Sequence, residues 1–374
     1  MTSDLVGLYV HIPFCSVKCF YCDFTAVAHH GHLVERYLRA LAAESKQKSR
    51  PKPDTVYVGG GTPSELSAPQ IRELFSILRS AYPGLSPIET TFEANPESID
   101  EEKLVALRDA GVTRLSIGLQ TADPVLMKGI GRRHTLDQFV AAYQAARRVG
   151  GFAISVDLMY NLPGQSVQSC LDSLEFVLKL QPEHLSLYGL QVEDQTLFGK
   201  RGITPDEDEG REMFERSLDR IAEAGFHHYE ISNFAQPGHE AKHNLIYWKN
   251  GEYVGLGAGA AQFLGGVRST NLDRLMPYME AAEAGEDPVE ETERLMGLQK
   301  LGENWILGLR LMDGFKPSRE MTAAFAAELI GLEGKGLIRR TEDVYALTRN
   351  GLFVANDVFR EFVLVHPSAE VANQ

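Results

Sequence analysis

Hydrophobic and polar residues alternate along the first two-thirds of the chain with two different periods. Short β-branched or aromatic runs with a strand-like period are each followed by a longer stretch in which apolar residues recur at helical spacing. This pattern predicts six successive βα units, whose right-handed crossovers would align six parallel strands in one sheet. The predicted strands lie at residues 8–12, 55–58, 89–93, 114–117, 154–159 and 184–187, and the predicted helices at 33–48, 68–81, 100–110, 135–149, 167–180 and 206–224.

The unusual residues of this region come directly after the predicted strands. Loops after six consecutive parallel strands meet at one mouth only if the sheet curls, as it does in a βα barrel. The sequence therefore predicts an α/β fold, an incomplete (βα)6 barrel with an open side. The loops in question are residues 13–24, 59–63, 94–96, Gln120 and its successors, 160–165 and 188–189.

The regular alternation ends near Gln236-Pro237-Gly238. We place a domain boundary there, between a barrel core of residues 1–235 and a C-terminal domain of residues 236–374. Within the second part, residues 321–333, 337–339, 345–347 and 348–362 predict helix, strand, strand and helix. This order indicates a small α+β domain similar to a winged helix, and the charge of the chain favours a packing role for it over DNA binding.

The composition is that of an ordinary folded protein, with 44% hydrophobic and 24% charged residues among 374. Lys and Arg total 37 against 51 Asp and Glu, and a net charge of −14 does not attract nucleic acid. No apolar run reaches the roughly 20 residues that cross a bilayer, and the first residues lack a secretory signal. We therefore expect a cytoplasmic protein with no membrane span and no nucleic-acid partner.

Three of the four cysteines, Cys15, Cys19 and Cys22, lie within eight residues in the spacing CxxxCxxC. In a reducing compartment this clustering favours metal or redox chemistry over disulfides. A structural zinc site needs four ligands, and His29 or His30 could supply the fourth. A four-iron cubane held by three thiolates would instead leave one iron open to a substrate. The cysteines alone leave both interpretations open.

The CxxxCxxC loop after the first strand of a partial barrel, with Tyr21 directly before the last cysteine, resembles the radical S-adenosylmethionine (SAM) superfamily. The resemblance implies a [4Fe–4S] cluster held by Cys15, Cys19 and Cys22, whose open iron chelates SAM and whose electron cleaves it to a 5′-deoxyadenosyl radical. Each implied SAM contact, taken singly, is also explained as a surface or barrel-lining polar residue. The contacts implied by similarity to coproporphyrinogen-oxidase-like members are Tyr9, Tyr21, Gly60, Gly61, Thr62, Glu93, Gln120, Arg132 and Asp157.

Within that superfamily the sequence resembles the HemW-type haem chaperones, which are related to oxygen-independent coproporphyrinogen III dehydrogenase. Phe24 stands where the dehydrogenase typically carries a further cysteine, and only fourteen residues precede Cys15, fewer than in the dehydrogenase. The matching segments are residues 9–15, 59–64, 93–96, 115–120, 157–160, 162–165 and 229–234.

The chaperones also carry a hexapeptide HNxxYW, which is present here at residues 243–248. It implies a haem site made by His243, Asn244, Tyr247 and Trp248, in which an imidazole ligates the iron and aromatic rings lie against the porphyrin. Packing at a domain interface is the alternative, because His243 and Tyr247 are one helical turn apart.

The resemblance thus implies a protein that binds haem as cargo and passes it to client haemoproteins such as respiratory enzymes. It also implies a homodimer and a reduced electron donor, and it assigns no catalytic residue. The main alternative is an enzyme, an oxygen-independent coproporphyrinogen III dehydrogenase that decarboxylates propionates and consumes SAM as oxidant. A zinc-stabilised barrel without redox chemistry is a third hypothesis.

Overall fold

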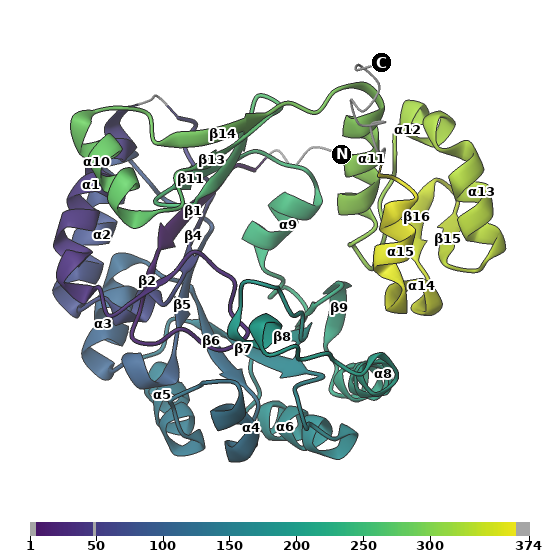
Figure 1. The fold of residues 1–374 in the computed structure, drawn as a ribbon, viewed down its shortest axis with the longest axis horizontal. Coiled ribbons are helices and arrows are strands. Elements are labelled where there is room, and N and C mark those ends of the chain that lie inside the picture. The colour runs from purple at the N-terminus through teal and green to yellow at the C-terminus, as the bar shows by residue number, and fades with distance from the viewer. Residues whose placement is uncertain (1–4, 48–49, 364–374) are drawn as a thin grey trace.

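The computed structural model describes residues 5–47 and 50–363 and contains a curved, mostly parallel sheet (Figure 1). Each of its six central strands pairs in parallel with the next, which confirms the predicted α/β partial barrel. These strands are β1 (Gly7–Ile12), β4 (Thr55–Gly60), β5 (Glu89–Ala94), β6 (Arg114–Gln120), β7 (Ala153–Tyr160) and β8 (His184–Gly189).

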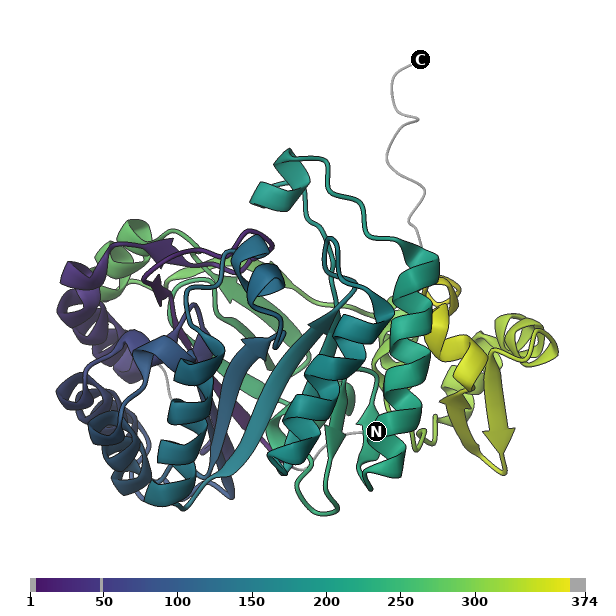
Figure 2. The ribbon, with the colours of Figure 1, turned by 90° about the horizontal axis from the view of Figure 1, so that it is seen from below.

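Six long helices follow these strands and cover the outer face of the sheet (Figures 1 and 2). Their ends agree closely with the predicted ranges because local caps mark them: Ser67 and Thr135 each begin a helix with a reciprocal side-chain cap. The helices are α1 (Val34–Gln47), α2 (Ala68–Ala81), α3 (Glu101–Ala110), α5 (Leu136–Val149), α6 (Val167–Lys179) and α8 (Glu207–Glu223).

The sheet continues beyond the six parallel strands at both edges. At one edge β10 (Asn233–Ala235) and β9 (His227–Glu230) are antiparallel to the rest. At the other edge β11 (Tyr253–Leu256) pairs in parallel with β1, and three antiparallel strands follow. The sheet therefore runs across residues 235 and 236, and the division of the chain at that point stays a prediction. The three outer strands are β12 (Ala261–Leu264), β13 (Val267–Asn271) and β14 (Val289–Glu293).

The C-terminal part packs around Trp305, which is fully buried against the rings of Phe315, Tyr345 and Phe362. The predicted order of helix, strand, strand and helix is present. The prediction of two unbroken helices is wrong, because each is interrupted by one residue outside the helical region. The elements are α11 (Gly297–Gly308), α12 (Arg319–Ala324), α13 (Ala326–Gly334), β15 (Ile338–Thr341), β16 (Val344–Leu347), α14 (Arg349–Phe353) and α15 (Ala355–Arg360), with the breaks at Phe325 and Val354.

Short elements complete the fold and carry several of the residues discussed below. None of the helices within the described ranges is both long and apolar enough to cross a membrane. The short elements are β2 (Phe14–Cys15), β3 (Val27–Ala28), η1 (Gly31–Leu33), η2 (Pro63–Glu65), η3 (Pro96–Ser98), α4 (Pro124–Gly129), α7 (Leu197–Lys200), α9 (Lys242–Trp248) and α10 (Leu275–Ala284).

Candidate metal and cofactor site

A cavity of about 370 Å³ lies inside the curved sheet, lined by the cysteine loop, the glycine turn after β4 and the inward-facing side chains of β4 to β8. Alternate residues of a strand face opposite sides, so every second side chain points inward. A closed βα barrel fills this space with Val, Ile and Leu. Here most of the lining residues that β5 to β8 contribute are polar, so the cavity offers hydrogen-bonding groups to a ligand or to water. From β5 to β8 the lining comprises Thr91, Glu93, Ala94, Arg114, Ser116, Gly118, Gln120, Ser155, Asp157, Met159, His184, Ser186 and Tyr188.

All three clustered cysteines line this cavity, and cationic and hydroxyl groups lie beside them. The Cys15 Sγ is 3.3 Å from the Thr62 Oγ1, and the Arg132 Nη1 donates to the Cys19 Sγ at 3.8 Å. Burial raises the pKa of Cys15, and it raises the pKa of Cys22 to about 11. Thiolates at these positions therefore need positive charge, which Arg132 and a metal would provide together.

The backbone next to the cysteines is shaped to leave room for a bound group. A Cβ on Gly61 would lie 3.0 Å from the Cys15 Sγ and 2.9 Å from the Phe14 carbonyl oxygen, so a larger residue would displace the loop. Across residues 5–47 and 50–363, no three His, Cys, Asp or Glu side chains are already grouped closely enough to hold a metal ion. His29 and His30 are exposed and do not line the cavity, so the structure does not bring the fourth ligand of the zinc hypothesis to the cysteines.

The predicted SAM contacts lie in the same cavity, with one exception. Tyr9 is absent from the lining: its hydroxyl bonds to the His11 Nδ1 at 2.9 Å, and its ring packs against that of Tyr57, which does line the cavity. Tyr9 therefore lies directly behind the lining, and its contact with SAM stays a prediction. The predicted residues that do line the cavity are Tyr21, Gly60, Gly61, Thr62, Glu93, Gln120, Arg132 and Asp157.

Two carboxylates make the middle of the cavity attractive to a cation. The Glu93 carboxylate accepts from the Tyr57 hydroxyl at 2.6 Å and from the Gly60 amide at 3.1 Å, while the Asp157 carboxylate accepts from the Ser116 hydroxyl at 3.0 Å. Burial raises the pKa of Glu93 to about 7 and also raises that of Asp157. A positively charged ligand group beside them would offset this cost of burial.

Sequence reasoning missed the polar residues that lie deeper in the barrel, namely Thr91, Arg114, Ser155, His184 and Ser186. A signal for them exists in the alternation of the strands themselves. In residues 184–188 the odd-numbered positions are leucine and the even-numbered ones are His, Ser and Tyr, so one face of the strand is polar although the strand is central.

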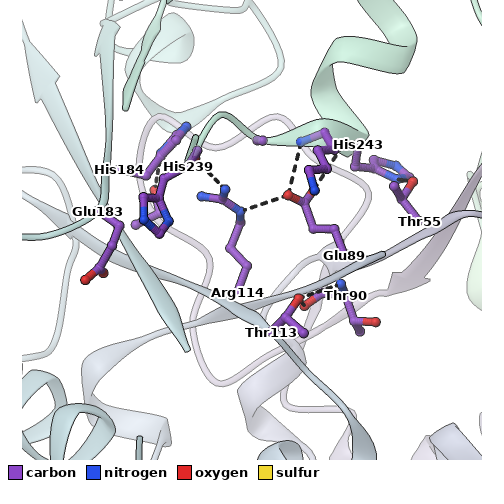
Figure 3. A network of polar contacts seen from close by, with 12 residues as sticks. Thr55, Glu89, Thr90, Thr113, Arg114, Glu183, His184, His239 and His243 are labelled. Atoms are coloured by element: carbon purple, nitrogen blue, oxygen red, sulfur yellow. Dashed lines mark hydrogen bonds and ion pairs between the residues drawn. The ribbon is translucent and has the colours of Figure 1, made fainter. Parts of the chain in front are cut away.

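The four residues of the predicted haem site do not line one common cavity. His243 in α9 is 1% exposed, and its Nδ1 bonds to the Thr55 Oγ1 at 2.8 Å (Figure 3). Its Nε2 bonds to the Tyr247 hydroxyl at 2.7 Å, so both ring nitrogens are engaged. Burial lowers the pKa of His243 to about 3. Asn244 lines the barrel cavity, whereas Tyr247 and Trp248 line a second cavity of about 560 Å³ beside α11. In this conformation His243 is therefore a packed, hydrogen-bonded side chain, as in the alternative to haem ligation.

The fold and the cysteine-lined cavity are those of a radical SAM protein, and the family model described as "Radical SAM superfamily" matches residues 9–177. This superfamily implies a [4Fe–4S] cluster and SAM. Proteins named "Heme chaperone HemW" match almost the whole chain. The Bacillus subtilis protein is 37% identical over 373 residues, covering 95% of this chain and 98% of the relative. The Lactococcus lactis protein is 37% identical over 370 residues, covering 95% and 97%. The chain belongs to the HemW family.

A solved structure supports the fold alone. The coproporphyrinogen III oxidase HemN of Escherichia coli, described as a radical SAM enzyme, superimposes with a TM-score of 0.84 and 22% sequence identity. The match covers 96% of this chain and 90% of that one. It shows that the C-terminal part and the added strands β11 to β14 belong to an architecture that HemN shares.

Proposed function

We propose that this chain binds haem and transfers it to haem-containing client proteins, and that its barrel holds a [4Fe–4S] cluster with SAM. The observation that carries the proposal is the similarity to proteins named heme chaperones along 95% of the chain. Phe24 supports it over the enzyme alternative, because the dehydrogenase typically carries a cysteine at this position.

In this proposal Cys15, Cys19 and Cys22 hold the cluster as thiolates, and Arg132 balances part of their negative charge. Glu93 and Asp157 bind the positively charged groups of SAM, and the backbone of the turn at Gly60 and Gly61 allows it to approach closely. Tyr21, Thr62 and Gln120 supply the remaining contacts. The bound cluster would supply the single electron that makes SAM a source of radical chemistry. The support is the common cavity that these residues line.

Haem titration tests the proposal directly. Protein reconstituted anaerobically should bind haem, with a change in the haem absorbance that saturates, and should lose it to a purified haem-free respiratory protein. Both the full-length chain and a Cys15→Ala variant are titrated, so that dependence on the cluster is measured at the same time. Absence of haem binding in the cluster-loaded protein would refute the proposal.

The position of the haem is tested at α9. We propose that Tyr247 and Trp248 offer flat apolar surface to the porphyrin, because both line the second cavity. His243 could ligate iron only if its hydrogen bond to Thr55 or to Tyr247 first breaks, because each ring nitrogen makes one of them. Tyr247→Phe releases one ring nitrogen and keeps the flat side chain, so it should preserve or strengthen haem binding if His243 is the ligand. His243→Ala should then abolish binding while iron and sulfide content stay unchanged, whereas unchanged binding assigns the ligand elsewhere.

The dehydrogenase is the second candidate function, because the architecture of this chain is so close to that of HemN. Incubation with coproporphyrinogen III, SAM and a strong reductant should yield no protoporphyrinogen if the chaperone proposal is right. Formation of that product at a rate that Cys15→Ala abolishes would establish the enzyme instead.

We also propose that the protein acts as a homodimer in the cytoplasm, is reduced by a separate electron donor, and serves respiratory haem enzymes. The names of the HemW relatives support haem delivery, and the partners follow from that role. Light scattering on the cluster-loaded protein measures the oligomeric state, and a mass of about 41 kDa would contradict the dimer.

A further inference from the structure

The deep end of the barrel carries a group of polar residues that the proposed cluster and SAM contacts do not use. Arg114 and His184 are the first residues of β6 and β8, so they lie at the strand ends opposite to the cysteine loop. Thr91 is paired in register with Arg114, and Ser155 with His184. All four line the cavity. We call these four residues the barrel floor.

Arg114 is a buried cation with an unused hydrogen-bond donor. It is 4% exposed, its Nε lies 3.4 Å from the Glu89 carboxylate and its Nη2 donates to the His239 carbonyl oxygen (Figure 3). The Glu89 carboxylate also accepts from the backbone amides of Lys242 and His243 at the start of α9. The Arg114 Nη1 has no hydrogen-bond partner among the residues that the structure describes. Burying such a donor unpaired is costly, which favours a ligand or water beside it.

Thr91 adds a second unused group. Its side chain is buried, and its Oγ1 has no hydrogen-bond partner within the described part of the chain. A threonine could be replaced by the isosteric valine at this position without loss of any bond that the structure contains. Because Thr91 is paired in register with Arg114, the two unpartnered groups lie on adjacent strands, and a bound acceptor or water would satisfy them.

A relay of hydrogen bonds directs a third donor into the floor. The Ala241 amide donates to the Tyr229 hydroxyl oxygen, which lies 2.8 Å from the His184 Nε2, and the His184 Nδ1 lies 2.7 Å from the Ser155 Oγ. Burial lowers the pKa of His184, so its ring is neutral. If Tyr229 donates to Nε2, the ring proton is on Nδ1 and is donated to Ser155. The Ser155 hydroxyl proton is then free for an acceptor in the cavity.

The cavity thus changes its hydrogen-bonding character along its length. Glu93 and Asp157 in the middle favour a cation, while the floor offers a guanidinium N–H and two hydroxyls to an acceptor. We propose that the barrel floor is a subsite for the carboxylate group of a small organic ligand. A carboxylate has two acceptor oxygens and no donor, which matches this set. A phosphate would bring more negative charge than a carboxylate into a cavity that already contains two carboxylates.

Carboxylate binding is measured with [1-¹³C]propionate added to cluster-loaded, full-length protein without SAM. Propionamide at the same ionic strength is the neutral control of equal shape. We expect the propionate carboxyl resonance to broaden and shift in a saturable way, and no saturable effect from the amide. Equal effects of the two compounds would show that the floor does not distinguish a carboxylate from a neutral amide and would overturn the proposal.

Thr91→Val is the decisive variant because it removes only the unpartnered hydroxyl. Propionate should bind about tenfold more weakly, the factor that loss of one hydrogen bond to a charged group produces, while the melting temperature stays the same or rises. Thr90→Val is the matched control, since Thr90 is the buried neighbour that does not line the cavity. Arg114→Met combined with Glu89→Gln removes both buried charges together and should abolish binding. Unchanged propionate affinity in Thr91→Val would refute the proposal.

A competition experiment identifies the molecule that supplies the carboxylate. Only this experiment rests on the proposed haem binding. Displacement of propionate by haem but not by haem dimethyl ester would assign the floor to a carboxylate arm of the cargo. Retention of propionate in the presence of bound haem would assign it to a separate small acid. If haem does not bind at all, the propionate titration still decides whether the subsite exists.

Discussion

Replacing Glu93 by glutamine tests the electrostatic account of the cavity most directly. The Glu93 carboxylate has two donors, the Tyr57 hydroxyl and the Gly60 amide, yet burial dominates and raises its pKa from 4.5 to about 7. The folded protein therefore holds the proton on Glu93 more tightly than the unfolded chain does. In the unliganded protein, ionisation of this group opposes folding.

The size of this effect follows from the pKa difference. A rise from 4.5 to about 7, at about 1.4 kcal/mol per pKa unit, corresponds to a penalty of at most about 3 kcal/mol. Because the folded-state pKa is raised, the penalty is absent below pH 4.5, grows through the window up to pH 7 and is complete above it. Water in the open cavity screens the charge and reduces the figure.

The assay compares the stability of wild type and Glu93→Gln between pH 4.5 and pH 8, by urea denaturation of the protein without cluster or SAM. Glutamine keeps one acceptor and cannot ionise, so the variant should gain up to about 3 kcal/mol relative to wild type as the pH rises. Glu290→Gln, at an exposed position in β14, should show no such trend. A stability difference that is flat in pH, or that favours wild type at pH 8, would refute the reasoning.

Three further predictions concern the loop and the core. Gly61→Ala should lower iron incorporation because its Cβ would contact the Cys15 Sγ, whereas Gly31→Ala, which meets nothing within 4 Å, should not; normal iron content in Gly61→Ala would contradict this. Cys15→Ala should abolish the absorbance near 400 nm of a reconstituted cluster, and Cys170→Ala, buried in α6, should retain it. Trp305→Ala should cost about 3–5 kcal/mol of unfolding free energy, measured with urea, because it empties the centre of the C-terminal part.

Much of the fold and site follows from local pattern in the chain. Strand and helix periods, together with caps such as Ser67 and Thr135, place the six βα units within a few residues of where they lie. The CxxxCxxC spacing confines three thiols to one loop after β1, and the chain order of parallel units brings that loop, Glu93 and Asp157 to one cavity. These features depend on neighbours in sequence or on the general handedness of βα connections, so they need no knowledge of distant contacts.

Other features depend on contacts between distant segments, and no local pattern predicts them. The pairing of Gly7 with Tyr253 extends the sheet across the expected boundary, and the packing of Tyr57 against Tyr9 leaves Tyr9 behind the cavity lining. His243 has the residue type of a haem ligand, but its ring nitrogens are engaged by Thr55 and by its own helix. The sequence determines the chemical type of each side chain. Whether that side chain is free to bind a ligand depends on which distant groups occupy its hydrogen bonds and the space around it.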